Sequence, residues 1–176
     1  MRGRLYTWLH QYYQQRLSQG HSGPLHVAAY WALEMEPDLG PLLVRLEDEA
    51  EFKLSLPTIV TPDAPLVFRP WVSSTPMKKG LFAIQEPDTT AEAGVPDVVL
   101  VPTLAFTRQG ERLGYGKGYY DRTLTQLKAQ NPALFALGIA WAVGDLSAYN
   151  YQAAPHDVPL NAILTDKGWP YAQPLS

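Results

Sequence analysis

The stretch 97–122, DVVLVPTLAFTRQGERLGYGKGYYDR, constrains the fold of this chain most strongly. Its first part, Val98–Val101, is a continuous apolar run, which is typical of a strand covered on both faces. Pro102 ends this run, a loop with alternate glycines follows, and a helix is expected from about Tyr119 to Ala129. A buried strand that leads through a loop into a helix is the repeating unit of a parallel α/β sheet.

The rest of the chain continues this alternation of strands and helices. Apolar residues at helical spacing predict an N-terminal helix within residues 1–24 and another helix after Pro41. Residues 73–96, rich in Pro, Ser, Thr, Ala and Gly, are expected to form a long loop around a short Leu81–Ile84 segment. Further strands are expected at Leu25–Leu33, Phe52–Val60, Leu66–Trp71, Leu134–Trp141 and Leu160–Leu164. The pattern predicts a single α/β domain over residues 1–176, with a mostly parallel central sheet flanked by helices in a Rossmann-like three-layer architecture.

Composition argues against several classes of protein. Apolar residues make up 46% of the chain and charged residues 18%, so one real core can form. The absence of cysteine excludes disulfides, thiolate catalysis and zinc–thiolate sites, and the four histidines lack metal-ligand spacing. A net charge of −3 disfavours nucleic acid as a partner. No apolar run is long enough to span a bilayer and no signal-peptide pattern opens the chain, so we expect a cytoplasmic protein without membrane contact.

The loop after the buried strand carries the features of a phosphate-binding site. Gly114, Gly116 and Gly118 would let backbone N–H groups approach an anion, and the following helix would point its positive end at the same place. Arg112 and Lys117 supply the positive charge that an oligophosphate needs. The loop is neither a Walker A motif nor a Rossmann fingerprint, because Lys117 is not followed by Ser or Thr and tyrosine stands where the third glycine belongs. Glycine-rich turns also occur for purely structural reasons.

Three residues at the start of the expected helix could contact a ligand. Asp121 could hold Mg²⁺ against phosphates, although an acidic residue in a first helical turn also stabilises the helix dipole. Tyr119 and Tyr120 could stack on a planar ligand, although such tyrosines are more often part of a core or its rim.

The same segment resembles a known enzyme family. The run RLGYGKGYYDR, preceded by VPTLAFTRQGE, closely resembles the signature of the 5-formyltetrahydrofolate cyclo-ligases, also called methenyltetrahydrofolate synthetases. Three weaker similarities follow in the right order: AAYWALEMEPD at 28–38, FAIQEP at 82–87 with Ala83 in place of a glycine, and PHDVPLNAILTD at 155–166. The resemblance runs from about residue 25 to residue 166.

The resemblance implies a reaction and its co-substrates. The family uses ATP and Mg²⁺ to convert 5-formyltetrahydrofolate to 5,10-methenyltetrahydrofolate, ADP and phosphate. The formyl oxygen is phosphorylated, N10 attacks the activated carbon, and phosphate leaves. An enzyme of this type aligns the γ-phosphate with the formyl oxygen and neutralises the charge that develops. Reduced folate and ATP are therefore the expected partners, with no obligate protein partner.

Roles carry over to this chain by motif. Lys117 and Arg112 would be catalytic and Asp121 and Asn161 would be metal ligands. The ATP site would comprise Arg112, Leu113, Gly114, Tyr115, Gly116, Lys117, Gly118, Tyr119 and Tyr120. Glu36 would accept N–H groups of the pterin, with Trp31, Tyr119 and Tyr120 around it, because a carboxylate can accept two such groups side by side. Read without the motif, Glu36 is an ordinary loop charge and Trp31 an ordinary core residue. His156 and Asp157 are expected to be a hydrogen-bonded loop pair rather than catalytic residues.

The chain also departs from the family pattern. Residues 1–24 form an atypical N-terminal helix, because family members usually begin with a basic helix whose Lys and Arg reach the phosphates. Asn161 stands where an aspartate usually helps to hold Mg²⁺, and Leu39 replaces a common threonine. Two alternatives follow: a paralogue that binds nucleotide or folate with little or no catalysis, and a nucleic-acid-binding module, against which the acidic composition counts.

Overall fold

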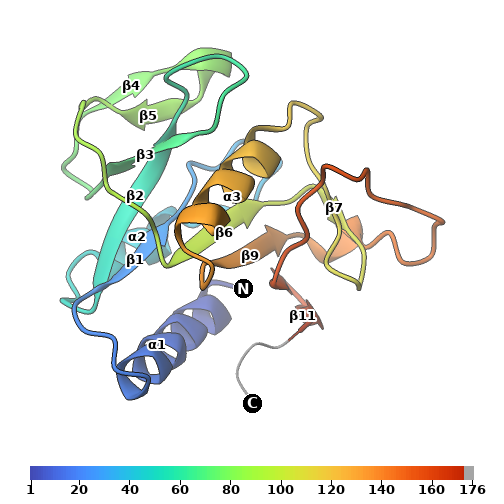
Figure 1. The fold of residues 1–176 in the computed structure, drawn as a ribbon, viewed down its shortest axis with the longest axis horizontal. Coiled ribbons are helices and arrows are strands. Elements are labelled where there is room, and N and C mark those ends of the chain that lie inside the picture. The colour runs from blue at the N-terminus through green and yellow to red at the C-terminus, as the bar shows by residue number, and fades with distance from the viewer. Residues whose placement is uncertain (173–176) are drawn as a thin grey trace.

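The computed structural model describes residues 1–172 and builds them around a seven-stranded sheet. Its strand order is β11-β10-β9-β6-β1-β2-β3 (Figure 1). These strands are β1 (Leu25–Ala28), β2 (Phe52–Thr58), β3 (Val67–Pro70), β6 (Val98–Pro102), β9 (Phe135–Ala140), β10 (Ala162–Thr165) and β11 (Gly168–Tyr171). The five inner strands are parallel, while the edge strands β3 and β11 run antiparallel to their neighbours.

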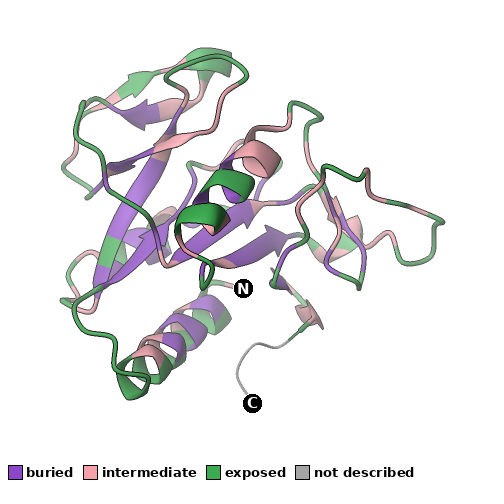
Figure 2. Cartoon of the chain, viewed as in Figure 1, coloured by how far each residue is buried: buried purple, intermediate pink, exposed green. Residues whose placement is uncertain are grey.

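Three helices cover the two faces of this sheet. Helices α1 (Arg2–Ser18) and α2 (Gly40–Leu46) pack on one face, and α3 (Tyr119–Gln130) packs on the other (Figure 1). Alternate residues of β6 divide between the two resulting cores: Val98 and Leu100 join the first, and Val99 and Val101 join the second. The middle of the sheet is accordingly buried on both sides (Figure 2). The predicted α/β fold with a mostly parallel sheet and three layers is confirmed.

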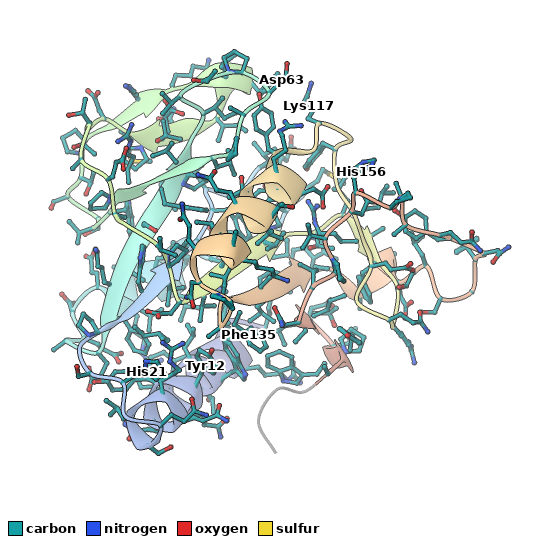
Figure 3. All side chains as sticks on the ribbon, in the orientation of Figure 1. Tyr12, His21, Asp63, Lys117, Phe135 and His156 are labelled. Atoms are coloured by element: carbon teal, nitrogen blue, oxygen red, sulfur yellow. The ribbon has the colours of Figure 1, made fainter. Side chains whose placement is uncertain are left out.

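Helix α1 is an integral part of the first core. Trp8 is buried and stacks on Tyr12 with ring centroids 5.0 Å apart, and both rings contact Phe135 of β9 (Figure 3). At the end of the helix, Arg16 pairs with Asp97 at 3.0 Å, just before β6 begins. These contacts fix the N-terminal helix against the centre of the sheet.

Two predicted elements differ from the structure. The expected strand Leu25–Leu33 ends at Ala28, because the chain leaves the sheet there and Tyr30 donates a hydrogen bond to the carbonyl of Pro37 at 2.8 Å. The expected long loop at 73–96 contains a hairpin of β4 (Met77–Lys79) and β5 (Gln85–Pro87). The hairpin tip is the 3-10 helix η1 (Leu81–Ala83).

Smaller elements complete the chain. The loop after β6 contains a second short hairpin, β7 (Ala105–Phe106) with β8 (Arg112–Leu113). A 3-10 helix, η2 (Ala142–Gly144), follows β9. Within residues 1–172, no helix is both long and apolar enough to cross a membrane.

Candidate active site

A cavity of about 950 Å³ opens beyond the carboxyl ends of β1, β2 and β6. Its wall continues through η1, the loop 112–118, the first turns of α3 and the segment 151–157. In open α/β sheets, ligands bind at this edge of the sheet. All the residues predicted to bind ATP or folate line this one cavity: Trp31, Glu36 and the continuous run Arg112–Tyr120.

Two glycines of the loop have a backbone conformation that favours glycine, and the third lies against the buried side chain of Arg112. Gly116 and Gly118 have φ angles of 79° and 70°, in the left-handed region that favours glycine. A Cβ atom at Gly114 would lie 2.7 Å from the Nη2 atom of Arg112. Gly118 is the residue before α3, and no side chain within residues 1–172 caps the first N–H groups of that helix. The loop therefore presents backbone donors and a helix N-terminus at the cavity wall, as an anion site requires.

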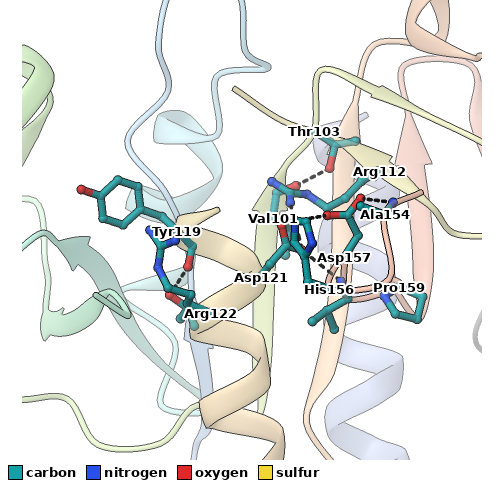
Figure 4. A network of polar contacts seen from close by, with 12 residues as sticks. Val101, Thr103, Arg112, Tyr119, Asp121, Arg122, Ala154, His156, Asp157 and Pro159 are labelled. Carbon is teal, nitrogen blue, oxygen red and sulfur yellow. Dashed lines mark hydrogen bonds and ion pairs between the residues drawn. The ribbon is translucent and has the colours of Figure 1, made fainter. Parts of the chain in front are cut away.

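Arg112 places a buried positive charge in the cavity. Its guanidinium lies 3.7 Å from the carboxylate of Asp121 and 5.6 Å from the centre of the Tyr120 ring (Figure 4). Only 9% of the residue is exposed, and its Nε has no hydrogen-bond partner within residues 1–172. A buried cation with unused donor capacity is suited to bind an anionic group.

Lys117 lies on the opposite, open side of the loop. Its ammonium group is 4.4 Å from the centre of the Phe82 ring, which belongs to η1. A cation over an aromatic face is held by the ring quadrupole but keeps its donors available. The loop thus carries one buried and one exposed cation.

Glu36 supplies a buried carboxylate on the β1 side of the cavity. The residue is 8% exposed, and one of its oxygens accepts a hydrogen bond from the N–H of Leu33 at 2.8 Å. Burial raises the pKa of this carboxyl, and the hydrogen bond from Leu33 only partly offsets the effect. A carboxylate that is shielded from solvent favours a ligand that supplies N–H donors.

Aromatic side chains surround this carboxylate. Burial raises the pKa values of Tyr30 and Tyr120, and the nearby negative charge of Glu36 raises them further. Both tyrosines therefore stay protonated at neutral pH: Tyr30 donates to the carbonyl of Pro37, and the hydroxyl of Tyr120 can donate to a ligand. Trp31 is 42% exposed and lies on the cavity wall, so its ring is accessible to a ligand rather than buried in the core. This end of the cavity suits a planar, donor-rich group.

The two predicted metal ligands are not brought together. Asp121 lines the cavity, where one carboxylate oxygen accepts the N–H of Val158 at 3.0 Å and also faces Arg112. Asn161 precedes β10 and lies at the amino end of that strand, the sheet edge opposite to the cavity. Its side-chain oxygen accepts the N–H of Ala136 at 2.8 Å. Within residues 1–172, no three His, Asp or Glu side chains are placed to hold a metal ion.

The loop pair His156 and Asp157 lies at the cavity wall. The two side chains are 3.4 Å apart, and Asp157 also accepts the N–H of Ala154 at 2.8 Å (Figure 4). His156 itself is largely exposed (Figure 3). This geometry is that of a hydrogen-bonded loop.

Comparison with known sequences identifies the family. The sequence pattern of the 5-formyltetrahydrofolate cyclo-ligase family matches residues 13–166. The chain belongs to this family.

Individual relatives agree with this membership. The 5-formyltetrahydrofolate cyclo-ligase of Haemophilus influenzae is 36% identical over 103 residues, which cover 56% of this chain and 53% of that protein. The cyclo-ligase of Mycolicibacterium smegmatis is 41% identical over 93 residues, which cover 49% of this chain and 44% of that protein. The chain thus spans about half the length of the curated relatives it matches.

Solved structures extend the likeness to nearly the whole chain. The NMR structure of Aquifex aeolicus 5,10-methenyltetrahydrofolate synthetase matches with a TM-score of 0.68 and 27% identity, over 94% of this chain and 80% of that one. A 5,10-methenyltetrahydrofolate synthetase from Mycoplasma pneumoniae shares the fold, with a TM-score of 0.57 and 24% identity over 92% of this chain and 85% of that one.

One departure from the cyclo-ligase pattern has a structural consequence. Ala83, which stands where the family motif has glycine, has a φ of 59°, and the preceding Phe82 has a φ of 56°. Side-chain-bearing residues rarely adopt this left-handed conformation. The tip of the β4–β5 hairpin is therefore strained at the cavity wall.

Phe82, Glu86 and Arg122 are among the cavity residues that sequence reasoning missed. Phe82 packs against Lys117, Glu86 is a buried carboxylate at the wall, and Arg122 contacts the glycine loop. Phe82 and Glu86 lie inside the FAIQEP segment, and Arg122 directly follows Asp121. The motifs were thus the available signal, but the contacts depend on the fold.

Proposed function

We propose that this protein is an ATP-dependent 5-formyltetrahydrofolate cyclo-ligase. It would convert 5-formyltetrahydrofolate and ATP into 5,10-methenyltetrahydrofolate, ADP and phosphate. One observation carries the proposal: a glycine loop with two cations and a buried carboxylate among aromatic rings line the same cavity. Membership of the cyclo-ligase family and the names of the relatives support the same assignment.

The loop side of the cavity would bind the triphosphate. Backbone N–H groups of 114–118 and the N-terminus of α3 would face the phosphate oxygens, with Arg112 on one side and Lys117 on the other. Lys117 has the more exposed charge and would neutralise the phosphoryl group in transfer. The γ-phosphoryl group would move to the formyl oxygen of the folate, which makes that oxygen a good leaving group.

The carboxylate side would bind the pterin. Glu36 would accept two N–H groups of the aminopyrimidinone, and Trp31 and Tyr120 would border its rings. With the folate held there, its N10 amine attacks the activated formyl carbon. The new C–N bond closes the ring, the N10 proton is released, and the C–O bond breaks as phosphate leaves. The protein contributes alignment and charge neutralisation.

The cavity residues fit a magnesium ion that arrives with the nucleotide. Mg²⁺ is commonly held by one or two carboxylates together with substrate phosphates. Asp121 is the candidate carboxylate, because it lies at the start of α3 beside the glycine loop. When bound, the ion would neutralise phosphate charge.

The proposal is tested by mixing the purified protein with 5-formyltetrahydrofolate, ATP and Mg²⁺ and following the methenyl chromophore. We expect product only when all three are present, and its loss in Lys117→Ala. Lys167→Ala is the matched control, because Lys167 is exposed and outside the cavity. Ligand-dependent thermal stabilisation without any product would instead establish a paralogue that binds but does not catalyse. That result would overturn the proposal.

A further inference from the structure

We infer that Arg122 is a positioning residue that sets the conformation of the glycine loop at Lys117 and Gly118. The inference rests on the proposed role of this loop in ATP binding. Arg122 lies in the first turns of α3, and its guanidinium reaches back to the loop that precedes the helix.

Arg122 makes two contacts with the loop. Its Nη2 donates a hydrogen bond to the backbone carbonyl of Lys117 at 2.8 Å. Its guanidinium lies 5.0 Å from the centre of the Tyr119 ring, and Figure 4 shows both residues at the start of α3. The carbonyl of Lys117 precedes α3, and the first backbone N–H bond across this turn goes from Arg122 to Gly118. The side chain of Arg122 therefore satisfies a carbonyl that lies just outside the helix.

The hydrogen bond fixes the orientation of one peptide plane. In a trans peptide the C=O and the following N–H point in opposite directions. Holding the carbonyl of Lys117 toward Arg122 therefore directs the N–H of Gly118 away from the guanidinium. Gly118 has a φ of 70°, and a glycine at that position leaves the peptide free to flip when nothing holds it.

The guanidinium also occupies the space beside Gly118. A Cβ atom at this position would lie 2.8 Å from Nη1 of Arg122. The positive φ favours glycine at 118, and a larger residue there would also have to displace the guanidinium of Arg122.

A second side chain holds the other end of Lys117. The ammonium of Lys117 lies 4.4 Å from the centre of the Phe82 ring, which meets the Tyr119 ring edge-on at 6.3 Å. Arg122, Lys117, Phe82 and Tyr119 therefore form a closed set of contacts in which Arg122 holds the Lys117 carbonyl and Phe82 holds its ammonium.

Arg122 is not fully satisfied by these contacts. Its Nε is buried and has no hydrogen-bond partner in the part of the chain that the structure describes. A buried donor without a partner is destabilising, so stability alone does not explain this placement. A role in shaping the phosphate loop explains it.

The test compares Arg122→Ala and Arg122→Lys with Arg45→Ala. Arg45 is a matched control, because it also stacks on a tyrosine, with its guanidinium 3.6 Å from the centre of the Tyr6 ring, but lies outside the cavity. ATP affinity is measured by calorimetry, kcat and both KM values by the chromophore assay, and Tm by thermal unfolding.

We expect Arg122→Ala to weaken ATP binding and lower kcat by about tenfold each, the effect of losing one charge-assisted hydrogen bond. The KM for folate should change less than about twofold, and the Tm should fall no further than in Arg45→Ala. Arg122→Lys should recover part of the loss, because an ammonium can reach the carbonyl but lacks the planar stacking face.

The outcomes separate this inference from the proposed function. An ATP affinity in Arg122→Ala within about twofold of wild type would overturn the inference even if wild type turns over. If wild type makes no product but Arg122→Ala binds ATP more weakly than wild type, the proposed function is overturned and the inference stands. Equal losses in ATP and folate binding with a lower Tm would mean that Arg122 acts only on overall stability, which also overturns the inference.

Discussion

Nη1 of Arg112 lies 3.7 Å from Oδ1 of Asp121, and both side chains are largely buried. The contact joins β8 to the first turn of α3 across the base of the glycine loop. Asp121 thereby compensates the charge that Arg112 brings into the cavity. The cation proposed to bind phosphate is held in place by the carboxylate proposed to bind the metal.

Asp121→Asn should destabilise the protein. The amide can still accept the N–H of Val158 but leaves the buried Arg112 charge unpaired, so we expect a loss of about 2 kcal/mol in the free energy of unfolding. Arg108→Ala, which breaks an exposed pair with Asp145, should cost at most about 1 kcal/mol. Urea unfolding of both variants measures the difference. Equal losses of unfolding free energy in the two variants would show that the Arg112–Asp121 pair stabilises the protein no more than a surface pair does.

The magnesium requirement of the reaction should depend on Asp121 and not on Asn161. Asp121→Asn removes the candidate carboxylate ligand beside the glycine loop, so it should raise the Mg²⁺ concentration for half-maximal activity by about tenfold. Asn161→Asp should leave that concentration unchanged, because residue 161 lies at the opposite sheet edge and bonds to Ala136. Initial rates across a Mg²⁺ titration measure this concentration in wild type and in both variants. A lower requirement in Asn161→Asp would place this residue at the metal after all.

Glu36 should make folding less favourable as pH rises. Its pKa is raised above the ordinary value of 4.5 by burial, so the folded protein holds this proton more tightly than the unfolded chain does. Below the ordinary pKa, Glu36 is protonated in both states and costs the folded protein no stability. Between the ordinary and the raised pKa, the loss of folding free energy grows with pH, and above both pKa values it is complete. Glu36→Gln removes the titration, so its stability relative to wild type should increase as the pH rises above the ordinary pKa of 4.5, as measured by urea unfolding across pH. A constant difference would show that Glu36 has no raised pKa.

Ala83→Gly should stabilise the protein. Ala83 has a φ of 59°, a conformation that glycine adopts without steric cost. We expect a gain of up to about 1 kcal/mol in the free energy of unfolding. Ala91→Gly is the control: this exposed loop alanine has no positive φ, so glycine there should lower stability slightly through the unfolded chain. Destabilisation by both variants would contradict a strained hairpin tip.

The elements with a clear pattern could be predicted from the sequence. The apolar run of β6 and the helical spacing of α3 appear within a residue or two of their observed bounds. The β4–β5 hairpin was missed because strands of three residues, with Lys78 and Lys79 exposed, show no alternation long enough to read. The first strand was predicted too long because Ala29 and Tyr30 are apolar for another reason: they pack in the core after leaving the sheet.

The candidate site also contains residues that the sequence predicts and residues that only the fold reveals. The loop residues 112–121 could be read as one motif because they are consecutive and lie in one turn. Phe82 could not, since its contact with Lys117 joins segments far apart in the chain. Asn161 follows the 151–157 wall segment closely in sequence, but the chain runs from there to the amino end of β10 and away from the cavity.

The central claim is that the turn from residue 112 to residue 121 binds a triphosphate. Calorimetric titration of MgATP into wild type, Lys117→Ala and the control Lys167→Ala tests it most directly. We expect one binding site per chain in wild type and Lys167→Ala, and an affinity at least about tenfold lower in Lys117→Ala. No heat of binding in wild type at saturating nucleotide, or equal affinities in all three proteins, would contradict it.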